Sequence, residues 1–160
     1  MRPVDVVRSR PDARTRGAII TRRALAAITL VGILFLGSIA WGATIGERRM
    51  ARYVNHSREI RNLVSLTWGW RLAREAQANS DRMARLGRLT HYSAESICTY
   101  RGENVGVVAP SGTLRGLHRA FMDSETHRAN ILNRSFRRIG VGIARDSTGL
   151  RWVTVVFCRG

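Results

Sequence analysis

The fold of this chain is decided by residues 101–143, which begin RGENVGVVAP and end MDSETHRANILNRSFRRIGVGI. The stretch contains two transitions from loop to strand, and it carries the side chains of Glu103 and His127. Those transitions could bring the two side chains together. With His91 just upstream, they define one possible polar pocket. The rest of the chain is interpreted outward from that pocket.

Strands and helices on either side of the pocket are indicated by the spacing of apolar residues. Residues 138–145 alternate Ile and Val with Gly and Ala, which predicts a strand whose glycines allow close backbone approach on one face. A β-forming run at 150–158 follows an Asp-Ser-Thr-Gly turn, so the two strands are expected to form an antiparallel hairpin. A helix with one buried face is predicted by the apolar stripe Leu114, Leu117, His118, Phe121 and Met122.

The preceding residues predict further helices and one short strand. Helices are expected over 55–64 and 69–86, with a break at Thr67-Trp68 and a polar loop over 88–102. A strand is expected over 105–108, and a short helix is expected to begin at Ser124 or Thr126 and to end near Leu132. Helices combined with an antiparallel sheet indicate a layered α+β domain.

The N-terminal part of the chain predicts a membrane anchor. Residues 24–45 contain no charge, and as a helix they would span about 33 Å, enough to cross a bilayer. Residues 1–23 contain seven arginines, which predicts a disordered cytoplasmic tail and a C-terminal domain outside. We therefore expect a single-pass cell-membrane protein with a linker over 46–53 and a domain over 54–160.

A cleaved signal peptide is the alternative to the anchor. A small-residue site at Ser38-Ile39-Ala40 would suit signal peptidase, and cleavage there would give a secreted protein. The apolar run is longer than a typical signal core, and Trp41 suits a membrane interface, which favours the uncleaved anchor. Either reading places the domain outside the cytoplasm.

Charge and cysteine content limit the partners and the compartment. All 27 basic residues are Arg, and the net charge of +16 is spread along the chain. Arginine used as the general surface cation explains this, so we expect no nucleic-acid partner; an anionic polymer is the alternative. Cys98 and Cys158, in a domain outside the cytoplasm, predict one disulfide worth about 4 kcal/mol, with two buried free thiols as the alternative.

The motifs of residues 54–158 resemble the CAP superfamily (cysteine-rich secretory proteins, antigen 5 and pathogenesis-related 1), also called SCP domains. Residues 102–105 are similar to its GEN motif. Residues 121–132 are similar to the bacterial S-x-x-HR-x-NIL motif, and residues 139–142 and 152–154 to the closing strands. The resemblance is to the short bacterial form, which together with the arginine bias indicates a bacterial source.

The resemblance implies a fold and a cleft. The fold would be an α-β-α sandwich of three layers with a central antiparallel sheet, preceded here by one transmembrane helix. The cleft would be lined by histidines and acidic residues. The matching positions in this chain are His91, Glu103 and His127, with Ser124 and Glu125 near the place where many relatives have a second glutamate. Many eukaryotic relatives bind lipids or sterols, some bind a divalent metal, and no general catalytic activity defines the family.

Two functions remain open for such a cleft. Two imidazoles and a carboxylate can bind Zn²⁺ or another divalent metal and leave one position for water, so His91, Glu103 and His127 are the candidate metal ligands. The first function is a monomeric, non-enzymatic module that binds a lipid, an envelope component or a protein partner. The second is an envelope hydrolase that uses a zinc-bound water.

The same residues could also have purely structural roles, and no catalytic residue is assigned. Glu103 could hydrogen-bond a loop, and His127 could satisfy buried backbone groups. The chain has no G-x-S-x-G elbow, and Ser124 lies three residues before His127 without an evident third orienting group. A binding module is therefore favoured over an enzyme. A structural envelope protein with a vestigial cleft is a third, weaker interpretation.

Overall fold

The computed structural model describes residues 43–92 and 98–159. The predicted cytoplasmic tail and nearly all of the predicted membrane helix lie outside the described residues. Within the described part of the chain, no helix is long and apolar enough to cross a bilayer. The elements follow in the order α1 (Ile45–Glu59), β1 (Thr67–Trp68), α2 (Trp70–Leu86), β2 (Tyr100–Val108), α3 (Leu114–Asp123), α4 (Glu125–Leu132), β3 (Arg138–Arg145) and β4 (Arg151–Arg159).

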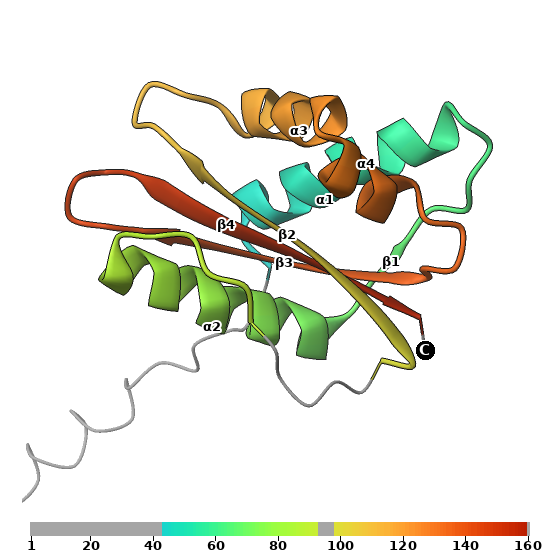
Figure 1. Cartoon of the computed structure of the whole chain (residues 1–160), viewed down its shortest axis with the longest axis horizontal. Helices are drawn as coiled ribbons and strands as arrows, with labels where there is room; N and C mark the ends of the chain where they lie inside the picture. The colour runs from blue at the N-terminus through green and yellow to red at the C-terminus, as the bar shows by residue number, and fades with distance from the viewer. Residues whose placement is uncertain (1–42, 93–97, 160) are drawn as a thin grey trace, which may run out of the picture. The chain divides into compact units, whose positions relative to one another are not determined.

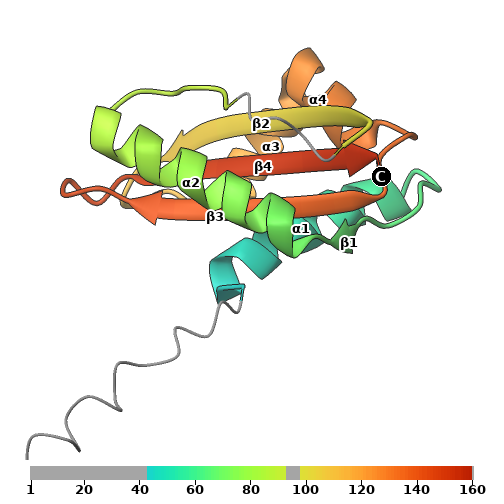
Figure 2. The same cartoon turned by 90° about the horizontal axis from the view of Figure 1, so that it is seen from below.

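These elements form a layered α+β domain, as expected. The strands stand in the order β1-β3-β4-β2, and helix α2 covers one face of the sheet while α1, α3 and α4 cover the other (Figures 1 and 2). The hairpin of β3 and β4 is antiparallel, and β2 pairs with β4 in the same sense. This arrangement confirms the helix-sheet-helix layering.

The sheet is mixed, so the prediction of an antiparallel sheet is wrong in one strand. Thr67–Trp68 pairs in parallel with β3, with Thr67 opposite Arg138. Thr67 N donates to Arg137 O at 2.9 Å, and Gly69 N donates to Ile139 O at 2.8 Å. Two residues are too few to show a periodicity, so the sequence predicts only a break between helices at this point.

The glycines of β3 bring α2 against the sheet. A Cβ added at Gly140 would overlap the backbone of Leu72 and Ala73, and one added at Gly142 would overlap the backbone of Ala76 and Gln77. Close backbone approach on one face of this strand is therefore confirmed. Two buried clusters lie under α2, one formed by Leu72, Ala76, Val156 and Cys158 and one formed by Met83, Val105 and Trp152.

The larger core lies on the opposite face, under α1, α3 and α4. Its fully buried side chains include Met50, Val54, Ile131, Phe136 and Phe157. Arg58 is also 0% exposed and donates to three backbone carbonyls, those of Val64, Ile131 and Asn133, at 2.8–2.9 Å. Burial, and secondarily the charge of Arg137, lowers the pKa of Arg58.

The start of the domain differs from the prediction. Residues 46–53, expected as a linker, belong to α1, and Met50 in that segment is 0% exposed. The helix begins with a capping box in which Thr44 Oγ1 accepts from Glu47 N and the Glu47 carboxylate accepts from Thr44 N. The uncharged run that precedes this Thr-x-x-Glu signal hid the helix start.

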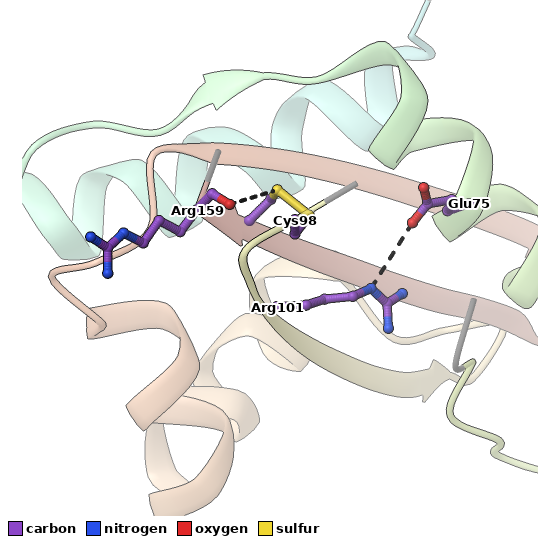
Figure 3. Close-up of a disulfide and its surroundings, with 5 residues drawn as sticks. Glu75, Cys98, Arg101 and Arg159 are labelled. Atoms are coloured by element: carbon purple, nitrogen blue, oxygen red, sulfur yellow. Dashed lines mark hydrogen bonds and ion pairs between the residues drawn. A yellow bond between two sulfur atoms is a disulfide. The ribbon is translucent and has the colours of Figure 1, made fainter. Parts of the chain in front are cut away.

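A disulfide joins Cys98 to Cys158, as predicted. It ties the segment that leads into β2 to the last residues of β4 (Figure 3). Strand β2 is also longer than the expected 105–108, because Tyr100 to Asn104 extend the ladder with β4. The cleft residues of the GEN motif therefore lie in a strand rather than in a loop.

Candidate functional site

Strand β2 supplies the centre of the candidate site. It is the last strand of the described sheet on its side, and its neighbouring side chains point to opposite faces. Arg101 and Glu103 face α2, since Arg101 Nε lies 4.0 Å from Glu75 Oε2 of that helix. Asn104 faces α4, where its Nδ2 donates to His127 O at 3.0 Å. The site therefore has two halves, one on each side of this strand.

The first half is centred on the carboxylate of Glu103, whose side chain is only 6% exposed. Its Oε1 accepts from Tyr92 N at 3.0 Å and lies 3.0 Å from His91 Nδ1. Its Oε2 accepts from Arg101 Nη2 at 2.9 Å. Two of the predicted site residues, His91 and Glu103, are therefore in contact, and the carboxylate also fixes the loop backbone at Tyr92.

Arg101 connects this carboxylate to the rest of its surroundings. Its Nη1 donates to Tyr92 O at 2.6 Å, and its Nε faces Glu75. Figure 3 shows the Arg101 side chain directed at Glu75 of α2. The sequence analysis did not predict Arg101 or Glu75 as site residues. Had residues 100–104 been recognised as part of a strand, the i, i+2 spacing would have placed Arg101 and Glu103 on the same face.

The second half is centred on His127 of α4. Its Nδ1 lies 2.8 Å from Ser124 Oγ, and its ring centroid is 4.9 Å from that of Phe121. Burial, and secondarily the charge of nearby His91, lowers the pKa of His127. This shift favours the neutral form of the imidazole.

Two asparagines hold α4 against β2, and neither was predicted. Asn130 Nδ2 lies 2.9 Å from Asn104 Oδ1 and 3.2 Å from Glu103 O. Asn104 is 0% exposed. This pair fixes the distance between the helix with His127 and the strand with Glu103. In the sequence, Asn104 is the last residue of GEN and Asn130 the first residue of NIL, but neither motif indicates that the two side chains are partners.

The remaining predicted residue is not part of these contacts. Glu125 is exposed in the first turn of α4. His118, in contrast, is a buried residue of the core side of α3, with its Nε2 2.8 Å from Ser57 Oγ and its Nδ1 buried without a hydrogen-bond partner among the described residues. The structure thus brings His91 to Glu103 and Ser124 to His127, and it leaves Glu125 at the surface.

A divalent metal does not fit the arrangement seen here. Among the described residues, no three His, Cys, Asp or Glu side chains come close enough together to hold a metal ion. Both oxygens of Glu103 are engaged, and one of them faces a guanidinium. A second cation would be repelled by Arg101. The metal set of His91, Glu103 and His127 stays a prediction, and no chemical step is derived through it.

The chemistry available to the site is mainly hydrogen bonding. The His91 side chain is 69% exposed and that of His127 is half-buried, so both can meet a ligand. Ser124 and His127 are within hydrogen-bond distance. However, the described contacts include no carboxylate that orients the ring of His127, which a nucleophile-base pair requires.

A separate hollow lies between α1 and β1, away from the histidines. It measures about 390 Å³, and its lining includes Arg48, Arg52, Trp68 and Trp70. The two indoles stand edge to face, with ring centroids 6.0 Å apart. None of the predicted site residues contributes to this hollow.

Comparisons with known proteins agree with this architecture. The family model described as "CAP: Cysteine-rich secretory protein family" matches residues 51–158. An outer surface protein from Borrelia burgdorferi matches with a TM-score of 0.62 at 15% identity, covering 70% of this chain and 90% of its own. An extracellular protein with an SCP domain from Bacillus anthracis matches with a TM-score of 0.61 at 24% identity, covering 72% of this chain and 40% of its own.

The manganese-bound structure of Ac-ASP-7 matches with a TM-score of 0.51 at 12% identity, covering 76% of this chain and 71% of its own. No curated protein matches the chain. At these identities the solved structures establish the fold alone.

Proposed function

Because this chain belongs to the CAP family of cysteine-rich secretory proteins, which matches residues 51–158, we propose that it is a membrane-anchored, extracytoplasmic binding module. The binding site that we propose lies along the edge of β2, with His91 and Glu103 on one side of the strand and His127 on the other. It recognises a lipid, an envelope component or a protein partner without chemical turnover. The Cys98–Cys158 disulfide supports a location outside the cytoplasm.

One observation carries the choice of binding over catalysis. Glu103 is the carboxylate that an acid-base or metal mechanism would need, and both of its oxygens already hold structural partners. A carboxylate fixed in this way orients His91 and the loop at Tyr92, so it shapes a surface. The hydrolase alternative requires Glu103 to exchange these partners for a metal.

The charge near the cleft favours an anionic ligand. In the strand register, Arg101 of β2 stands opposite Cys158 of β4, and Cys158 stands opposite Arg138 of β3. All three residues therefore lie at one end of the sheet. Arg134, Arg137 and Arg138 are exposed at or just before that end. Exposed arginines bind phosphate and carboxylate oxygens with two parallel hydrogen bonds. Anionic phospholipid headgroups and anionic wall polymers share this chemistry.

Anchoring is the second part of the proposal. The uncharged run of residues 24–45 ends at the first residue of α1, so the folded domain begins directly after it. An uncleaved anchor would therefore hold the domain close to the bilayer surface, within reach of lipid headgroups. Resistance of the full chain to alkaline extraction from membranes tests this part separately.

Histidine resonances give a direct test of the cleft. The full chain, labelled at its histidine rings and placed in nanodiscs of zwitterionic lipid, would be titrated with a soluble short-chain phosphatidylglycerol. We expect saturable shifts of the His91 and His127 resonances and no shift of exposed His56, which serves as the internal control. His127→Ala should weaken the response.

Three results would contradict this proposal. One is the absence of any shift, both with the lipid and with an anionic wall polymer as a second probe. Another is a shift that is as large at His56 as at the cleft histidines. The third is turnover of an ester, glycan or peptide substrate that disappears in His127→Ala, which would support the hydrolase instead.

A further inference from the structure

We propose that Arg101 is the resident cation of this cleft, holding Glu103 and Glu75 in the way a divalent metal would and thereby excluding one. The inference goes beyond the proposed function, because it concerns which cation the site contains and not which ligand it binds. It rests on the contacts of the Arg101 guanidinium group and on the way the backbone of Arg101 is fixed.

Each of the three guanidinium nitrogens of Arg101 faces an oxygen atom of another residue. Nη2 donates to Glu103 Oε2 at 2.9 Å, Nη1 donates to Tyr92 O at 2.6 Å, and Nε lies 4.0 Å from Glu75 Oε2. The three charged side chains are mostly removed from water, with exposed fractions of 16% for Arg101, 6% for Glu103 and 20% for Glu75. In such surroundings the attraction between opposite charges is screened much less than at a free surface.

The balance of charge shows why a cation is needed. Without Arg101, the largely buried carboxylates of Glu75 and Glu103 would lose the positive charge that both of them approach. Two negative charges held in one site repel each other unless a positive charge offsets them. Two carboxylates and an imidazole are a ligand set that Zn²⁺ and Mn²⁺ accept, although with Arg101 in place these described side chains do not lie close enough together to hold a metal ion. Arg101 supplies the positive charge from within the chain.

Two buried polar atoms at the contact between Arg101 and Glu75 lack hydrogen-bond partners within the described part of the chain. Glu75 Oε2 and Arg101 Nε are both buried without a hydrogen-bond partner among the described residues, although they face each other. Buried polar atoms of this kind are uncommon in folded proteins. The Glu75 carboxylate is therefore held to Arg101 by charge more than by a hydrogen bond.

The backbone of Arg101 is fixed in place. Arg101 stands opposite Cys158 in the β2–β4 ladder, and Cys158 is bonded to Cys98, three residues before Arg101. Figure 3 shows the disulfide and the Arg101–Glu75 pair close together. A metal entering the cleft cannot displace Arg101 by moving the strand. It would have to turn the guanidinium out and break its contacts with Glu103 and Tyr92.

Calorimetric titration of the metal alone tests the assignment. The full chain in mild detergent would be titrated at pH 7 with Zn²⁺ and, separately, with Mn²⁺. We expect the wild type to show only weak, non-stoichiometric metal binding. Arg101→Gln should gain a stoichiometric site whose affinity is at least tenfold higher than that weak binding. The gained site should disappear in Arg101→Gln/Glu103→Gln. Arg101→Lys, which keeps the charge, should not gain it.

A measurement on the wild type removes the dependence on how the variants fold. The side-chain Nε resonance of Arg101 should stay unchanged in millimolar Zn²⁺. A zinc-dependent shift of this resonance that is lost in Glu103→Gln would overturn the proposal. A wild-type site that depends on Glu103 and His91 would also overturn it, as would a folded Arg101→Gln chain that gains no site. None of these outcomes bears on lipid binding, so the two proposals can fail separately.

Discussion

Gly142→Ala tests the contact that holds α2 against the sheet. The added Cβ would overlap backbone atoms of Ala76 and Gln77, which cannot rotate away as a flexible side chain would. The helix would have to lift off β3 at this point. We expect a loss of stability well above that of an ordinary point mutation, which is usually about 1 kcal/mol.

The magnitude follows from the contacts that the displaced helix would lose. Forcing an extra carbon into a packed interface costs about 1–3 kcal/mol. Gln77 also makes two hydrogen bonds to the backbone of Ile143, at 2.9 and 3.2 Å, and Ser80 Oγ donates to Gly142 O at 2.9 Å. At about 1 kcal/mol for each hydrogen bond, the total loss is about 4–6 kcal/mol.

Urea unfolding of the full chain in detergent, followed by tryptophan fluorescence, measures this loss. Gly116→Ala is the matched control, because a Cβ there meets only Thr113 Oγ1, at 3.4 Å, on the exposed side of α3. The control should gain about 0.5–1 kcal/mol, since Ala is favoured over Gly inside a helix. A loss below 1 kcal/mol for Gly142→Ala, or an equal loss for the control, would refute the reasoning.

Two further predictions concern buried ionisable groups. Arg58→Met should cost about 3–5 kcal/mol, because the carbonyls of Val64, Ile131 and Asn133 lose their only described side-chain donor, and a result near zero in the same urea assay would contradict this. His127 should titrate below the ordinary histidine pKa of 6.5, and His91→Ala should raise its pKa, as seen by NMR. Because the folded pKa lies below the unfolded one, stability from this group should fall as pH drops below about 6.5. A His127 that titrates above that value would exclude the predicted burial effect.

The parts of the fold that were predictable have a repeating pattern. The alternation in residues 138–145 gave both the strand and the close approach of α2, because a glycine at every second position clears a whole face. The stripe on α3 gave a helix with one buried face for the same reason. In contrast, β1 is two residues long, and its parallel pairing with β3 depends on tertiary contacts that no local pattern encodes.

The candidate site was predictable as a set of positions but not as a network. Motif resemblance named His91, Glu103 and His127 as one set, and in the structure His91 Nδ1 lies 3.0 Å from Glu103 Oε1. It did not supply Arg101, because a polar loop over 88–102 gives no reason to compare side chains two residues apart. Only the ladder with β4 makes Arg101 and Glu103 neighbours on one face. Asn130 was hidden in the same way, since its partners lie in a strand 26 residues earlier.

The register of β2 accounts for why the motif places a carboxylate next to an amide. Glu103 and Asn104 point to opposite faces, so the carboxylate reaches His91 and Arg101 while the amide reaches α4. A slip of one residue would exchange the two side chains and break both halves of the site. The Cys98–Cys158 bond lies at the same end of the ladder, opposite Arg101, and opposes such a slip. The disulfide therefore preserves the geometry of the site as well as the stability of the domain.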